Sequence, residues 1–156
     1  VTTIKDAAFS GCTSLPGFEI VPDSVTFIGE YVFSNCSFDK VIIPKNMKYI
    51  GAYAFEYCEN LTEITLPSGL ETMGSYMLRG TKVKTVTVPN TVKTMAKRSG
   101  VYDISCFEGS SVETVIFEDG IVDIPARACR NMPKLKSGYV PKSVKNHNKL
   151  IPKSVT

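Results

Sequence analysis

Cysteine is the residue type in this chain best suited to chemistry, because thiolates bind metal ions and form disulfides. Three of the five cysteines, Cys12, Cys36 and Cys58, recur at equivalent positions of a repeated segment. No C-x-x-C pair and no nearby histidine accompanies them, and metal sites need such groups. A buried free cysteine behaves as a small hydrophobic residue. We therefore predict a column of buried thiols and no metal site.

The other two cysteines leave two alternatives open. Cys129 aligns with Phe107, and Cys106 aligns with Ala128 in the next repeat. This alignment places the two sulfur atoms one repeat apart, which is within reach of a disulfide. Free thiols and a Cys106–Cys129 bridge are both compatible with the spacing.

Groups for catalysis are scattered along the sequence. The only histidine, His147, lies in a polar tail, and we expect Glu63, Glu113, Glu118 and Asp119 at scattered strand edges. Acid-base catalysis requires carboxyl groups that converge in one cleft. The sequence contains no G-x-S-x-G, P-loop or H-E-x-x-H motif. We predict that the protein is not an enzyme and uses no cofactor.

The composition is that of a globular domain. Of the 156 residues, 43% are hydrophobic and 21% are charged, and the net charge is only +3. No apolar run approaches the roughly 20 residues of a membrane span, and the basic residues are dispersed until the tail. These features predict one domain without membrane insertion and without a nucleic-acid footprint.

A repeat explains the positions of these residues. The segment "YIGAYAFEYCENLTEITLP" (49–67) resembles "FIGEYVFSNCSFDKVIIP" (27–44) and "TMGSYMLRGTKVKTVTVP" (72–89). Two series of equivalent residues keep steps of 22 to 24 residues, apart from one step of 29 in each. The first series is Phe9, Phe33, Phe55, Leu78, Phe107 and Cys129, and the second is Pro22, Pro44, Pro67, Pro89, Glu118 and Pro141. Such a period indicates a stacked repeat architecture.

One unit shows how the repeat folds. In "LTEITLP" the apolar Ile64 and Leu66 alternate with the polar Glu63 and Thr65, as in a strand with one buried face. Pro67 ends the strand because it has no N–H to donate. The following "IGAYAF" is predicted to be a turn or short helical segment.

A single unit cannot bury its own apolar face, whereas stacked units bury one another's. We therefore predict a right-handed solenoid with one parallel β-sheet and about six coils of 22–23 residues. The whole chain, 1–156, is expected to be one domain and part of a longer protein. The predicted coils are about 4–25, 26–47, 48–70, 71–92, 93–121 and 122–144, and 145–156 forms a tail or partial cap.

These motifs resemble the leucine-rich repeats of the BspA type, whose pattern is roughly L-x-x-I-x-L-P-x-x-L-x-x-I-G-x-x-A-F-x-x-C. The resemblance extends from about Ile4 to Val144 and is closest over 49–67. The departures are Leu78 and Thr81 in the fourth unit, the insertion "KRSGVYDIS" in the fifth, and Cys129 in the sixth.

The resemblance implies a cell-surface or secreted protein of a bacterium or parasitic protist that adheres to other cells or to host matrix proteins such as fibronectin or fibrinogen. The sequence opens without a basic segment followed by an apolar one, so we expect that a targeting signal is absent or was removed ahead of residue 1. We therefore expect a non-enzymatic protein-binding module, whose partner is an extracellular-matrix or cell-surface protein. The alternative is a structural spacer with no ligand of its own.

Repeat proteins bind through equivalent outward positions of successive coils. The candidate binding face on the strands consists of Phe18, Ile20, Lys40, Ile42, Glu63, Thr65, Thr85, Thr87, Thr114, Ile116 and Tyr139. Its exposed apolar members suit a partner, although β-propensity or covering coils of a longer chain would also explain them.

Three further features leave alternatives open. Lys97, Arg98 and Tyr102 lie in the inserted loop, which is either a binding element or a tolerated length change. Another column, formed by the tyrosines two residues before the Phe series, either packs ring on ring or stacks on a ligand. Uncovered ends of the array would also allow end-to-end self-association.

Overall fold

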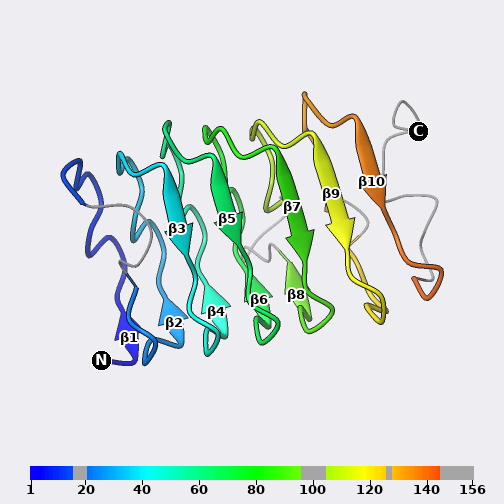
Figure 1. The fold of residues 1–156 in the computed structure, drawn as a ribbon, viewed down its shortest axis with the longest axis horizontal. Helices are drawn as coiled ribbons and strands as arrows, with labels where there is room; N and C mark the ends of the chain where they lie inside the picture. The colour runs from blue at the N-terminus through cyan, green and yellow to red at the C-terminus, as the bar shows by residue number, and fades with distance from the viewer. Residues whose placement is uncertain (16–20, 96–104, 126–127, 145–156) are drawn as a thin grey trace, which may run out of the picture.

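The computed structural model describes residues 1–15, 21–95, 105–125 and 128–144, and these residues wind as a parallel β-solenoid (Figure 1). The coils follow one another along the long axis from the N terminus to the C terminus. The four coils that carry β2 to β9 each contribute one strand to each of two layers, and the predicted solenoid is confirmed. The described residues contain no helix.

The first layer, called here the short-strand sheet, consists of two-residue strands in the order β1-β2-β4-β6-β8. These strands are β1 (Thr3–Ile4), β2 (Phe27–Ile28), β4 (Tyr49–Ile50), β6 (Thr72–Met73) and β8 (Thr94–Met95). The second residue of each strand is buried and pairs in register with its counterpart. In-register parallel pairing stacks like residues above one another and produces the columns of the core.

Glycine follows three of these short strands because neighbouring backbones almost touch there. A Cβ atom on Gly51 would lie 2.4 Å from the carbonyl carbon of Gly29, and one on Gly74 would lie 2.2 Å from the amide nitrogen of Ala52. No side chain fits at such distances. The glycine column therefore sets the close spacing of the first four coils.

The second layer carries the longer strands, and its outward side is called here the long-strand face. It contains β3 (Lys40–Ile42), β5 (Glu63–Thr65), β7 (Thr85–Val88), β9 (Thr114–Phe117) and β10 (Ser137–Tyr139). The strands pair as β3-β5 and β10-β9-β7. The prediction of one parallel sheet is wrong in this detail, because the described residues form three parallel sheets in two layers.

Strand pairing is interrupted between β5 and β7. The fourth coil is one residue shorter before its long strand, since "TKV" (81–83) stands where the third coil has "CENL" (58–61). The Lys82 amide donates to the Leu61 carbonyl at 2.9 Å across this interruption. The second coil is shorter by the same residue, yet β3 pairs in register with β5, so this difference in length does not by itself separate the sheets.

The "IGAYAF" segment is a turn, as one of the two predicted alternatives proposed. Tyr31, Tyr53 and Tyr76 have φ values of 57°, 59° and 54°. A right-handed helix cannot pass through residues in this left-handed region. The segment instead forms a third row of backbone hydrogen bonds between coils. In it, the Phe33 amide donates to the Ala54 carbonyl at 2.9 Å and the Phe55 amide donates to the Met77 carbonyl at 3.1 Å.

Most of the predicted Phe series lies in the core. Phe33, Phe55 and Phe107 are buried, as are Leu78 and Cys129 at the equivalent positions. Phe9 differs, because 38% of its surface is exposed. It belongs to the first coil and stacks on Phe33 with 5.6 Å between ring centroids.

Candidate protein-binding face

The outward positions of the long strands form two parallel rows across the long-strand face. Strand pairing places Lys40 beside Glu63 and Ile42 beside Thr65. It also places Thr85 and Thr87 of β7 beside their counterparts on β9, and these beside β10. The intervening residues Val41, Val86 and Val115 are buried. The candidate residues on the described strands therefore share one face, as the alternation predicted.

Two large apolar side chains stand out on this face. Ile42 is 51% exposed and Tyr139 is 50% exposed, and they lie on the two outermost described strands of the layer. Ile116 is half-buried. A hollow of about 310 Å³ adjoins Ile42 and is also lined by Val21, Pro22, Asp23 and Pro44. These groups give the face apolar contact area at both of its ends.

Polar side chains occupy the middle of the face. The Lys40 ammonium lies 2.9 Å from the Glu63 carboxylate. The hydroxyl groups of Thr114 and Ser137 lie 2.8 Å apart. Thr65, Thr85 and Thr87 are exposed. The hydroxyls of these threonines offer hydrogen bonds to a partner.

Tyr139 is held by a polar contact at its tip. Its hydroxyl donates to the Asp119 carboxylate at 2.8 Å. This hydrogen bond to Asp119 raises the pKa of the Tyr139 hydroxyl. The ring is thereby oriented, with its apolar body left accessible.

Five predicted residues lie outside the described part of the chain. They are Phe18 and Ile20 of the strand face and Lys97, Arg98 and Tyr102 of the inserted loop. Their roles remain predictions.

The sequence analysis missed a row of ion pairs at the border of this face. Glu113 bridges two lysines, with 2.7 Å to Lys84 and 2.6 Å to Lys136. Hydrogen bonds from Lys136 and Lys84 lower the pKa of the Glu113 carboxyl to about 2. A second bridge joins Lys48 and Lys93 through Glu71. The signal for both was opposite charge at equivalent positions of successive coils.

The tyrosine column packs ring on ring. The Tyr31 and Tyr53 rings are 4.5 Å apart and 3° from parallel, and the Tyr53 and Tyr76 rings are 5.2 Å apart. The Arg79 guanidinium lies over the Tyr57 and Tyr76 rings, 5.5 and 5.3 Å from their centroids. These contacts support the packing alternative for this column.

Arg79 also pairs with Glu56 at 3.4 Å. Glu56 is largely buried, and desolvation raises the pKa of its carboxyl, which the Arg79 charge partly offsets. A shallow hollow of about 560 Å³ borders Arg79 and is also lined by Tyr76, Glu108, Gly109, Asn131, Met132 and Pro133.

None of the five cysteines is joined in a disulfide. The Cys36 thiol donates to the Phe9 carbonyl at 3.1 Å, and the Cys58 thiol donates to the Phe33 carbonyl at 3.0 Å. Burial raises the pKa of Cys58 to about 12 and that of Cys129 to about 12. The predicted thiol column is confirmed for Cys36 and Cys58, whereas Cys12 is only half-buried.

Among the described residues, no group of three or more His, Cys, Asp or Glu side chains is placed to hold a metal ion. None of the described segments forms a helix long and apolar enough to cross a membrane.

A family model described as the BspA type leucine rich repeat region matches six copies over residues 1–99 and 97–151. Among solved structures, a leucine-rich repeat protein of T. pallidum superposes with a TM-score of 0.67 at 21% identity, over 91% of this chain and 64% of that protein. A leucine-rich repeat protein of Bacteroides ovatus gives a TM-score of 0.49 at 20% identity, over 96% of this chain and 54% of that protein. The chain thus spans less than two thirds of either protein. A search of curated proteins found no match.

Proposed function

The chain belongs to the BspA-type leucine-rich repeat family, and from this we propose that it is a non-enzymatic protein-binding module of a cell-surface or secreted protein. Leucine-rich repeats of this kind suggest a protein-interaction module. We further propose that its partner is an extracellular-matrix or cell-surface protein and that its role is adhesion.

One observation carries the proposal. Ile42 and Tyr139 are each about half exposed at opposite ends of the long-strand face, on strands whose other exposed outward residues are polar. Water disfavours exposed apolar area of this kind, whereas a protein partner removes it from water. Tyrosine at an interface supplies contact area and a hydrogen bond at low entropic cost.

The experiment measures binding of the chain to immobilised fibronectin, fibrinogen and laminin. The variant Ile42→Lys/Tyr139→Ser removes both apolar groups from the long-strand face. The matched control, Val122→Lys, changes an apolar residue that is 66% exposed and lies after β9, outside the outward strand positions. Circular dichroism first establishes that each variant folds.

The proposal predicts specific binding that the double variant loses by tenfold or more, about 1.4 kcal/mol, and that the control retains. An equal loss in both variants would place the contact elsewhere. If the unsubstituted chain binds none of the three proteins, a structural spacer without a ligand of its own explains the result better than a matrix-binding module.

A further inference from the structure

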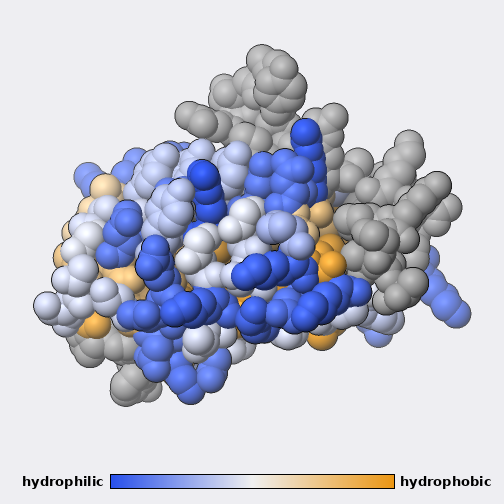
Figure 2. Space-filling view, turned by 90° about the horizontal axis from the view of Figure 1, so that it is seen from above, coloured by the Kyte–Doolittle hydropathy of each residue, from blue (hydrophilic) through white to orange (hydrophobic). Residues whose placement is uncertain are grey.

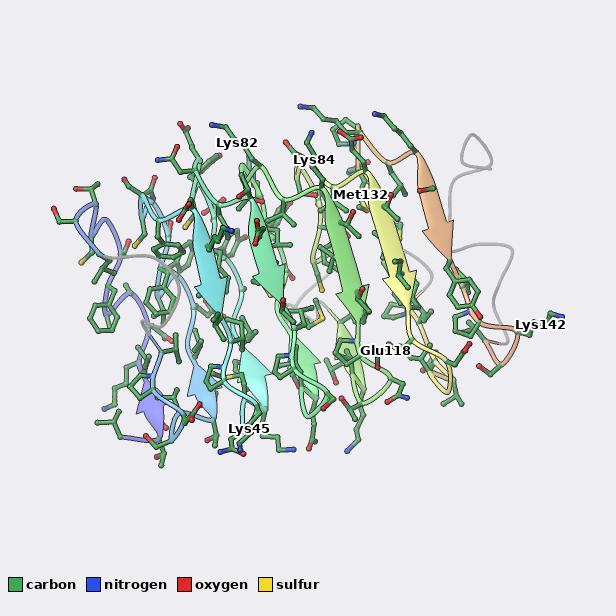
Figure 3. All side chains as sticks on the ribbon, in the orientation of Figure 1. Lys45, Lys82, Lys84, Glu118, Met132 and Lys142 are labelled. Atoms are coloured by element: carbon green, nitrogen blue, oxygen red, sulfur yellow. The ribbon has the colours of Figure 1, made fainter. Side chains whose placement is uncertain are left out.

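Four lysines gather at the border where the strands of the β7-β9-β10 sheet begin, called here the amino rim. Lys84 and Lys136 directly precede β7 and β10, and Lys82 and Lys134 lie two residues earlier in the same turns. All four side chains are exposed. Figure 3 places Lys82 and Lys84 together at this end of the strands, and Figure 2, seen from this side, shows a predominantly hydrophilic surface.

The positive charge of this cluster is not balanced locally. Glu113 is the carboxylate between the lysines, and it already bridges Lys84 and Lys136. Lys82 and Lys134 have no ion pair with any described residue. Among the described residues, the four lysines of the rim therefore share one ion-paired carboxylate.

The cluster is compact and has acidic borders. Lys84 and Lys136 are two coils apart, which is about 10 Å along the solenoid. Toward the N terminus, the rim continues with the exposed acids Glu59 and Asp39. At the carboxyl end of the same strands lie Glu118 and Asp119 together with one lysine, Lys142, and Figure 3 shows Glu118 at the end opposite Lys84.

We propose that the lysines of the amino rim bind a short acidic segment of the protein partner that docks on the adjoining long-strand face. An extended stretch of about three acidic residues covers about 10 Å. A long, uniformly anionic polymer such as a sulfated polysaccharide or nucleic acid would extend onto the acidic borders and be repelled. The compactness of the patch therefore favours protein, and the inference rests on the proposed function for that class of partner.

The acidic border also fixes the orientation of the partner. A partner that places acidic groups on the amino rim and basic groups near Glu118 and Asp119 meets opposite charge at both ends of the strands. Turning it around would bring like charges together at both ends. Such charge complementarity sets register and raises the association rate.

The other Lys–Glu–Lys bridge of the molecule provides an internal contrast. Lys48, Glu71 and Lys93 form it at the opposite end of the coils. The residues two positions before these lysines are Asn46 and Thr91, which are uncharged. Near that bridge lies one further lysine, Lys45, against two at the amino rim, so its positive charge is smaller and we assign the bridge a structural role only.

The test uses a fluorescent peptide of ten alternating Glu and Ser residues, with a Gln and Ser peptide as the uncharged control. Lys82→Gln/Lys134→Gln removes two rim charges and leaves both bonds to Glu113 intact. Lys45→Gln/Lys142→Gln removes the same charge at the opposite ends of the long strands, where Figure 3 places both residues. The two variants therefore have equal net charge.

At low ionic strength we expect the rim variant to weaken binding of the acidic peptide about tenfold and the control variant less than about twofold. Equal weakening by the two variants would overturn the rim site. A heparin fragment that competes for the same lysines and binds more tightly than the peptide would overturn the choice of a protein segment.

The matrix-protein panel separates this inference from the proposed function. If the rim variant binds a matrix protein as tightly as the unsubstituted chain, while Ile42→Lys/Tyr139→Ser loses that binding, the rim site is rejected. The proposed function as a protein-binding module is then retained. Peptide binding that depends on the rim, with no matrix protein bound, would leave the rim site standing and reject the proposed matrix partners.

Discussion

The first three coils and the last three follow the same repeat, yet the aromatic columns that join the first three are interrupted in the last three, while lysine–glutamate ion pairs occur in both halves. In the N-terminal half, aromatic columns connect the coils, with Phe33 stacked on Phe55 at 5.6 Å and Tyr31 stacked on Tyr53 at 4.5 Å. In the C-terminal half, the Phe column is interrupted by Leu78 and Cys129. Lysine–glutamate bridges centred on Glu113 connect the rims of those coils.

This difference separates what the fold requires from what it tolerates. Both halves keep the backbone ladders between coils and the buried apolar positions, such as Val86 and Val115 at the centre of β7 and β9. The identity of the side chains in a column varies as long as the volume is filled. Charged side chains stack at the rims and also on the long-strand face, as in the Lys40–Glu63 pair, where water solvates them.

The largest expected effect comes from breaking the aromatic column. Phe55→Ala should lower the free energy of unfolding by about 4 kcal/mol, because it removes a fully buried ring and its stacking contacts. Leu78→Ala, one coil further on, should cost about 3 kcal/mol. Urea denaturation measures both. A smaller cost for Phe55→Ala than for Leu78→Ala would contradict the importance of the stack.

The second largest expected effect comes from adding a side chain to the glycine column. Gly51→Ala should cost about 2 kcal/mol or more, because the new methyl group would overlap the Gly29 backbone. Gly69→Ala is the control, since its nearest contact would be 3.2 Å away in a surface turn. Equal melting temperatures of the two variants would show that the coils are not closely spaced at Gly51.

A smaller effect is expected from acid. The folded-state pKa of Glu113 is about 2, which is below its ordinary value. Ionisation of Glu113 therefore stabilises the fold above the ordinary pKa, and this contribution disappears as the pH falls toward 2. Glu113→Gln should lose less stability over that range than the unsubstituted chain.

Thermal melts at neutral pH and at successively lower pH test this expectation. Glu118→Gln serves as the charge-matched control, because Glu118 has no ion pair with a described residue. An acid profile of Glu113→Gln that coincides with that of the unsubstituted chain would show that the bridge to Lys84 and Lys136 does not stabilise the fold.

The smallest perturbation is chemical labelling of the thiols. In the folded protein, iodoacetamide should modify Cys12 first, because it is only half-buried. Cys58 and Cys129 should react far more slowly, since they are buried and their pKa values are about 12. Mass spectrometry follows the order, and rapid labelling of Cys58 would contradict a closed core.

The sequence predicted the solenoid and most of the core because the same residue types recur at equivalent positions of successive coils. The alternation of Glu63, Ile64 and Thr65 placed the long strand and its outward side chains correctly. The period alone identified the columns that contain Phe33, Phe55 and Cys58.

The second layer was missed because two-residue strands such as β2 and β4 are too short for an alternating pattern. Nor did the sequence predict positive φ at Tyr31 and Tyr53, since tyrosine rarely adopts it. Backbone hydrogen bonds between coils hold these tyrosines in place, and their acceptors are more than 20 residues away in the sequence.

For the candidate site, alternation predicted which residues face outward but not which contacts they make. The bond from Tyr139 to Asp119 crosses between coils, and the bridge from Glu113 to its lysines depends on how coils separated by 29 and 23 residues align. A comparison of charge signs at equivalent positions would have found the bridge.

Hydroxyl-radical footprinting of the chain, alone and bound to the tightest-binding matrix protein of the panel, tests the central claim most directly. The account predicts that Ile42 and Tyr139 lose reactivity on binding while Val122 and Tyr57, both exposed outside the long-strand face, stay unchanged. Protection of Val122 and Tyr57 with full reactivity of Ile42 and Tyr139 would contradict the long-strand face as the binding surface.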